Sequence, residues 1–223
     1  MTQQKAILNL DSIIKKIEFA RLQNSDHHIV QLVAISKYST SDDIRTMYNS
    51  GQRAFGENKV QDLKLKQQQL EDLPIAWHFV GTLQKNKINN LIDLDPVLMH
   101  SLDSYDLAWE LDKKLKLKNK TMNCLLQINS AYEDTKSGVD PKNATEIYKK
   151  IQNDFSNIKL KGVMSIGAHT TSHEDIIKSF QTTKSIYDSI DGQILSMGMS
   201  SDFELAILNG SNMIRVGSSL FQS

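Results

Sequence analysis

Cysteine is almost absent from this sequence, since Cys124 is the only one in 223 residues. A single thiol excludes a disulfide within the chain and any metal site built from several cysteines. Because Cys124 lies in the apolar segment 122–128, we expect it to be a buried, inert thiol. Four histidines show no metal-ligand spacing, so no metal site is predicted from them: His27, His28, His169 and His173.

The sequence also lacks net charge and long apolar runs. Its 26 basic residues balance 26 acidic ones, so no overall field favours nucleic acid, an anionic membrane or acidic macromolecules. The expected ligand is therefore a small molecule. No apolar run is long enough for a signal peptide or a membrane span, and we expect a soluble, cytoplasmic protein.

Short apolar segments alternate with helical patterns along the whole chain, without a linker or a low-complexity tract between them. The apolar segments are typical of strands buried in a parallel sheet, because they are short and are followed by turn or capping residues. The predicted strands are 32–35, 53–57, 76–81, 97–102, 122–129, 160–167, 194–199 and 213–216.

Helices are predicted before and between these strands. Leu10, Ile13 and Ile17 recur at helical spacing and indicate an amphipathic helix ahead of the first strand. Further helices are expected at 41–48, 60–70 and 84–92, and after Ser104, Pro141, Ser172 and Ser201. The alternation predicts one domain, residues 1–223, forming a single (β/α)8 TIM barrel with an extra N-terminal helix. A doubly wound open sheet is the alternative.

Lys37 stands just past the first predicted strand, and Thr40 and Ser41 begin a helix soon after it. Such strand-to-helix corners line the ligand face of parallel α/β proteins. A lysine held there beside a low-dielectric wall can lose its proton and act as a nucleophilic amine. A solvated loop lysine is the alternative interpretation.

Serine and glycine follow the last two predicted strands. After the seventh strand, Ser201 and Glu204 have the spacing of a capping box, and the N-terminus of that helix would favour an anion. After the eighth strand, Gly217 and Ser218 would let backbone N–H groups and a hydroxyl approach a phosphate. Barrels commonly bind phosphate at these two positions, so we predict a phosphate site, with ordinary turns as the alternative.

In a closed barrel the first and last strands are neighbours, so Lys37 would face this phosphate site. An amine opposite a phosphate site suits a phosphorylated aldehyde, either a sugar phosphate or pyridoxal phosphate. Arg215 lies within the eighth strand, where side chains alternate between interior and exterior. An inward guanidinium could contact a ring nitrogen, and a structural ion pair is the alternative.

Seven motifs spread over nearly the whole chain resemble one known family. They are AISKYS around Lys37, GQRAFGENKVQ from Gly51, WHFVGTLQKNK from Trp77, HSLDS from His100, KGVMSIG from Lys161, SMGMSSDFELAI from Ser196 and IRVGSSLF from Ile214. Together they resemble the pyridoxal phosphate homeostasis protein family, whose fold is the barrel half of alanine racemase.

The resemblance implies that pyridoxal 5′-phosphate is the cofactor and that Lys37 holds it as a Schiff base. It also implies that Arg215 approaches the pyridine nitrogen. The remaining residues that it implies are Ser200, Gly217 and Ser218 around the phosphate and Asn58 beside the cofactor.

Three positions depart from the usual family pattern and affect only the expected rim of the pocket. Lys59 replaces a tyrosine, Thr82 replaces histidine or proline, and Ser218 replaces threonine while keeping the hydroxyl. His78 and His100 recur in the family motifs, and we expect both to be core histidines satisfied by hydrogen bonds.

Two function classes remain. One is a monomeric binding protein that buffers or delivers the cofactor to pyridoxal phosphate-dependent apoenzymes, and the other is a racemase or decarboxylase. In racemase relatives the resemblance implies a second domain with a tyrosine acid/base, whereas only Gln222 and Ser223 follow Phe221 here. A cation at the ring nitrogen would also weaken the electron sink. We therefore predict binding without catalytic residues. A Schiff-base aldolase ranks last, because it would not use Arg215 in this way.

Overall fold

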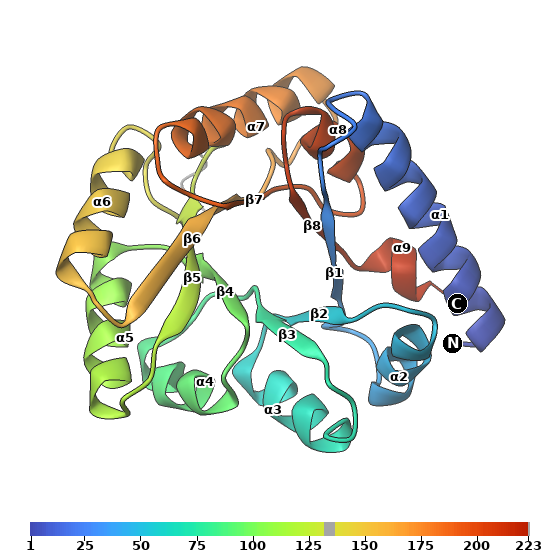
Figure 1. Ribbon diagram of the computed structural model, residues 1–223, viewed down its shortest axis with the longest axis horizontal. Helices are drawn as coiled ribbons and strands as arrows, with labels where there is room; N and C mark the ends of the chain where they lie inside the picture. Colours follow the sequence, from blue (N-terminus) through green and yellow to red (C-terminus); the bar gives the residue numbers. More distant parts are fainter. Residues whose placement is uncertain (132–136, 223) are drawn as a thin grey trace.

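The computed structural model describes residues 1–131 and 137–222, and its eight parallel strands close into a barrel in sequence order (Figure 1). The strands are β1 Gln31–Ile35, β2 Ala54–Glu57, β3 Ala76–Phe79, β4 Leu98–Leu102, β5 Met122–Ile128, β6 Ile158–Ser165, β7 Ile194–Ser196 and β8 Met213–Val216. Pairing of β1 with β8 closes the sheet, with Val33 opposite Arg215. The predicted TIM barrel is confirmed and the open doubly wound sheet is wrong.

Helices surround the barrel, as the alternation predicts (Figure 1). They are α1 Gln3–Leu22, α2 Ser41–Asn49, α3 Val60–Gln69, α4 Ile88–Leu94 after the 3-10 turn η1 Lys85–Lys87, α5 Tyr105–Leu117, α6 Ala144–Asp154, α7 His173–Asp188, α8 Phe203–Leu208 and α9 Ser218–Phe221. The short α9 is not foreseen by the sequence. In the described part of the chain, no helix has both the length and the apolarity to cross a bilayer.

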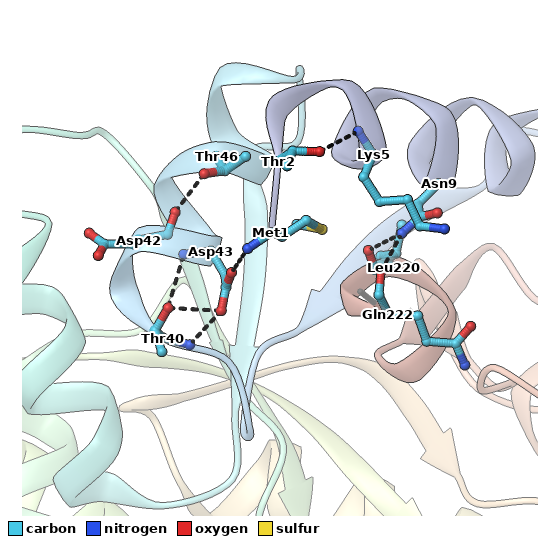
Figure 2. Close-up of polar contacts among 10 residues, drawn as sticks. All are labelled: Met1, Thr2, Lys5, Asn9, Thr40, Asp42, Asp43, Thr46, Leu220 and Gln222. Atoms are coloured by element: carbon cyan, nitrogen blue, oxygen red, sulfur yellow. Dashed lines mark hydrogen bonds and ion pairs between the residues drawn. The ribbon is translucent and has the colours of Figure 1, made fainter.

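The extra N-terminal helix α1 packs on the outside of the barrel against α2, α8 and α9 (Figure 1). Its buried residues are Ala6, Leu10, Ile13, Ile17 and Ala20. On the same helix, Asn9 Nδ2 donates to the carbonyl oxygens of Leu220 at 3.0 Å and Gln222 at 3.1 Å (Figure 2). Helix α1 thus ties down the elements that follow β8 and β1, the two strands that close the barrel.

Side-chain caps mark the start of four of the described helices, α1, α2, α5 and α7. Thr40 Oγ1 accepts from the Asp43 N–H at 3.2 Å and Asp43 Oδ2 accepts from the Thr40 N–H at 3.1 Å, so a capping box starts α2 (Figure 2). The side chains of Ser104 and Ser172 likewise cap α5 and α7, as predicted. The capping box at Thr40 places the turn that carries Lys37 directly ahead of the start of α2.

The capping box predicted at Ser201 and Glu204 is wrong. Helix α8 begins one residue later, with Asp202 as its N-cap and no capping hydrogen bond from that side chain. Asp202 Oδ1 instead accepts from the Met199 N–H at 2.6 Å, which closes the turn before the helix and leaves Ser201 exposed. Glu204 pairs with Lys16 Nζ of α1 at 3.1 Å.

The barrel interior holds both apolar and polar side chains. One apolar cluster consists of Val33, Ala54, Leu98, Leu125, Met164 and Met213. The polar side chains His100, Ser196 and Arg215 are also buried, and hydrogen bonds join them. Cys124 is fully buried, as predicted, and burial raises the pKa of its thiol. Of the buried polar residues, Arg215 reaches the ligand face, which parallel barrels present at the carboxyl ends of their strands.

Candidate functional site

A cavity of about 790 Å³ opens at the carboxyl ends of the strands. Its volume lies within the range of small-molecule binding sites, about 300–1,000 Å³. Residues from the ends of β1, β6 and β8 and from the loops after β1, β2, β3, β7 and β8 line it. All six residues predicted to bind a cofactor line this one cavity: Lys37, Asn58, Ser200, Arg215, Gly217 and Ser218.

Lys37 occupies the corner between β1 and α2 at the mouth of the cavity. Its side chain is exposed, and its Nζ atom lies 5.0 Å from the centroid of the Tyr38 ring. Tyr38 itself is 90% exposed. The lysine thus faces both the apolar side chains of the cavity, such as Ile35, and a solvent-exposed aromatic ring, which sequence reasoning did not single out.

The loops after β7 and β8 meet beside the end of β1. The Gly217 N–H donates to Ser200 Oγ at 3.2 Å, which joins the two predicted phosphate-binding turns. A Cβ atom at Gly217 would lie 3.1 Å from the Ile35 carbonyl oxygen, so glycine permits this close approach. Ser218 is exposed and begins α9. Backbone and hydroxyl donors of the two turns consequently lie on one side of the cavity, near Lys37.

Arg215 places a buried cation in the cavity wall. Its Nη1 donates to Ser196 Oγ at 2.6 Å and to the Ser196 carbonyl oxygen at 3.0 Å, and its Nη2 donates to the Ser165 carbonyl oxygen at 2.9 Å. Burial lowers the pKa of Arg215 to about 10, while the charge of Asp202 acts to raise it. The guanidinium is thus still positive at neutral pH and is fixed by hydrogen bonds within the barrel.

A buried charged cluster supports the strand end that carries Lys37. Lys66 Nζ of α3 donates to Glu57 Oε1 at 2.6 Å and to the Ser36 carbonyl oxygen at 2.7 Å. The Ser36 hydroxyl donates to the same carboxylate oxygen at 2.6 Å, and Glu57 is fully buried. The cluster anchors residue 36, next to Lys37, to β2 and α3.

Sequence reasoning missed this cluster although the chain carries a signal for it. Val60 and Leu63 are buried on α3, Leu70 is buried at its C-cap, and Lys66 falls on the same helical face between Leu63 and Leu70. A lysine in an apolar stripe needs a buried partner, and Glu57 at the end of the preceding strand supplies it.

His78 and His100 are buried side chains that hydrogen-bond each other, as predicted for core histidines. His78 Nδ1 lies 2.9 Å from His100 Nε2, and His100 Nδ1 lies 3.2 Å from Ser196 Oγ. Burial lowers the pKa of His78 to about 4 and that of His100 well below its ordinary value. Both rings are therefore neutral at pH 7. Among the described residues, no group of three or more acidic, histidine or cysteine side chains is arranged to hold a metal ion.

The positions that depart from the family pattern lie at or outside the rim. Thr82 is exposed and lines the cavity, whereas Lys59 is exposed at the N-cap of α3. Asn58 lines the cavity and packs against Gly81, where a Cβ atom would lie 1.9 Å from the Asn58 carbonyl oxygen. Only glycine fits at this contact, which holds the loops after β2 and β3 together.

The chain matches the family model described as alanine racemase, N-terminal domain, over residues 9–223. It is 54% identical over 214 residues to the pyridoxal phosphate homeostasis protein of Helicobacter pylori, and this alignment covers 96% of each protein.

Two solved structures extend the comparison. PipY of Synechococcus elongatus with PLP bound superposes with a TM-score of 0.81 at 30% identity, covering 97% of this chain and 99% of that one. Alanine racemase of Clostridium difficile in complex with cycloserine gives a TM-score of 0.74 at 14% identity, covering 92% of this chain and 59% of that one. The second likeness concerns the barrel fold alone.

Replacing Lys66 by methionine should destabilise the protein by about 3–5 kcal/mol, because the substitution leaves the Glu57 carboxylate buried without its cation. Chemical denaturation would measure the change in the free energy of unfolding. Lys64→Met is the matched control, since Lys64 lies on the exposed face of the same helix and should change stability by less than about 0.5 kcal/mol.

Replacing Glu57 by glutamine in the Lys66→Met background removes the orphaned charge and should recover part of the lost stability. Equal effects of Lys66→Met and Lys64→Met would contradict the role given to the buried pair.

Proposed function

This chain belongs to the alanine racemase N-terminal domain family and, within it, to the pyridoxal phosphate homeostasis proteins, and we propose that it binds pyridoxal 5′-phosphate and buffers or delivers it inside the cell. The observation that carries the proposal is that an amine, a fixed cation and two donor-bearing turns line a single cavity: Lys37, Arg215, and the turns at Ser200 and Gly217.

The cavity residues suit the chemical groups of this cofactor one by one. The phosphate would be held by the hydroxyls of Ser200 and Ser218 and the Gly217 N–H, with Arg215 toward the ring nitrogen and Asn58 beside the ring. When bound, the cofactor supplies an aldehyde. The Lys37 amine would condense with that aldehyde and release one water molecule, giving a Schiff base.

The exposure of Lys37 supports storage and release. A Schiff base is reversible, and one formed at an open mouth can be reached by water or by the amine of another protein. We infer that the recipients are pyridoxal phosphate-dependent apoenzymes. The cation of Arg215 also argues for binding, because a positive charge near the pyridine nitrogen disfavours its protonation and weakens carbanion stabilisation.

A racemase or decarboxylase is the second candidate, and one observation favours it. Tyr38 stands beside Lys37, so an amine and a phenol, two groups that can act as acid and base, lie together at the mouth of the cavity. Against this, Tyr38 is 90% exposed, whereas acid/base groups of such reactions work best where water is excluded. We therefore place turnover second.

The purified protein, incubated with pyridoxal phosphate, should develop an absorption band in the near-visible that borohydride reduction fixes onto Lys37. Lys37→Ala should lose this band and keep its fold, since an exposed lysine at a strand end leaves no core cavity. Absorption spectroscopy and peptide mass mapping measure both effects. A wild type that stays colourless with excess cofactor would sink the proposed function.

Replacing Ser200 and Ser218 together by alanine should weaken the binding of pyridoxal phosphate far more than that of pyridoxal. Each hydroxyl should contribute on the order of 1.5–3 kcal/mol through its hydrogen bond to the charged phosphate. Fluorescence titration of both vitamers gives the comparison. Ser219→Ala is the control, since Ser219 is the next residue of α9 and does not line the cavity as described. Equal losses for the two vitamers would mean that the phosphate binds elsewhere.

Incubation with L- and D-alanine, lysine and ornithine should yield no racemised or decarboxylated product beyond one equivalent per protein. Chiral chromatography and amine analysis are the measurements, with Tyr38→Phe as the variant that removes the neighbouring phenol. Repeated turnover that disappears in both Lys37→Ala and Tyr38→Phe would replace the carrier proposal by an enzymatic one.

A further inference from the structure

A continuous line of buried polar side chains crosses the barrel interior behind Arg215. From β8 the Arg215 Nη1 reaches Ser196 Oγ of β7 at 2.6 Å, and this hydroxyl lies 3.2 Å from His100 Nδ1 of β4. His100 Nε2 then lies 2.9 Å from His78 Nδ1 of β3. The remaining nitrogen, His78 Nε2, is buried and has no hydrogen-bond partner among the described residues.

We propose that Ser196, His100 and His78 are positioning residues for Arg215, joined to it by hydrogen bonds that all run in one direction and hold the guanidinium at the cavity wall. None of the three lines the cavity as described, so they would act through Arg215. The claim that Arg215 contacts a bound ligand rests on the proposed function, whereas the hydrogen-bonded chain does not depend on it.

The direction of the chain follows from counting donors. Arginine can only donate, so Ser196 Oγ accepts from it and has its own proton to give. If that proton goes to His100 Nδ1, then His100 carries its hydrogen on Nε2 and donates it to His78 Nδ1. A single donor, His78 Nε2–H, is then left without a partner.

The opposite direction leaves more groups unsatisfied. His78 Nδ1–H would donate to His100, and His100 Nδ1–H would donate to Ser196 Oγ, which already accepts from Arg215. The Ser196 proton and the bare His78 Nε2 would then both lack recorded partners. Because unsatisfied buried polar groups are costly, the first direction is favoured.

The electrostatics favour the same direction. In the favoured direction the lone pairs of Ser196 Oγ and His100 Nδ1 point toward the cation, and the N–H of each imidazole points away from it. Burial lowers the pKa of both His100 and His78, and the charge of Arg215 lowers that of His100 further, so both rings stay neutral acceptors. The neutral rings and the buried cation therefore stabilise each other.

Nitrogen-15 NMR of the ligand-free protein tests the direction without any cofactor. We expect both His78 and His100 to be neutral at pH 7 with the proton on Nε2 and the lone pair on Nδ1, the signals being assigned with His78→Asn and His100→Asn. A proton on Nδ1 of either ring, or a charged ring at pH 7, would overturn the proposed chain.

Ser196→Ala tests positioning, because it removes the hydroxyl while keeping the backbone carbonyl that Arg215 also contacts. Exchange of the Arg215 guanidinium protons with water should become about tenfold faster in the ligand-free variant, because the guanidinium has lost one hydrogen bond. Ser211→Ala is the control. Ser211 is an equally buried serine that bonds the carbonyl oxygens of Leu195, Met197 and Met213 and has no recorded bond to Arg215.

Titration with pyridoxal phosphate and pyridoxal completes the test. Ser196→Ala should weaken the binding of both vitamers by about tenfold, because Arg215 would contact the ring that they share and not the phosphate. Ser211→Ala should change neither affinity by more than about twofold. If Ser196→Ala keeps the wild-type rate of guanidinium proton exchange and the wild-type affinity for both vitamers, the positioning role is refuted. If the wild type binds no vitamer, the proposed function fails, and the NMR and exchange measurements still decide this inference.

Discussion

Closure of the sheet between β8 and β1 is the constraint on which the site depends. Parallel pairing sets Val33 beside Arg215 and Ala34 beside Val216, so the last strand delivers its carboxyl end next to the first. The amine after β1 and the donor-bearing turn after β8 are far apart in the chain and meet only because the barrel closes. The packing of α1 against α2, α8 and α9 covers this seam and so stabilises the site as well as the fold.

The site also requires charges to be buried, which opposes stability. Arg215 sits among backbone carbonyls and a serine, and Glu57 with Lys66 is enclosed between β2 and α3. Apolar residues in these places would pack at least as well, since a buried ion pair seldom stabilises more than its hydrophobic substitute. Arg215 lines the cavity, and the Glu57–Lys66 pair holds Ser36 next to Lys37. These positions indicate that the buried charges hold the residues of the site in place.

Much of the fold could be predicted because it depends on local periodicity and turn chemistry. Each predicted strand appears within a few residues of its predicted bounds, and the cap at Ser104 is where the pattern puts it. The errors arise where a long-range contact overrides a local signal. Asp202 bonds the Met199 N–H and displaces the cap expected at Ser201, and Lys66 is buried because a carboxylate from another element meets it.

The arrangement of the site gives its two ends different physical roles. At the inner end, Arg215 is held by hydrogen bonds and cannot follow a ligand that moves, which favours one fixed orientation of a ring. At the outer end, Lys37 is exposed beside Tyr38, and water has access to any bond formed there. A rigid recognition surface joined to an accessible, reversible attachment point fits a protein that takes up and gives back its ligand. A catalyst would instead need the reacting bond shielded from water, and the end of this cavity that carries Lys37 is exposed.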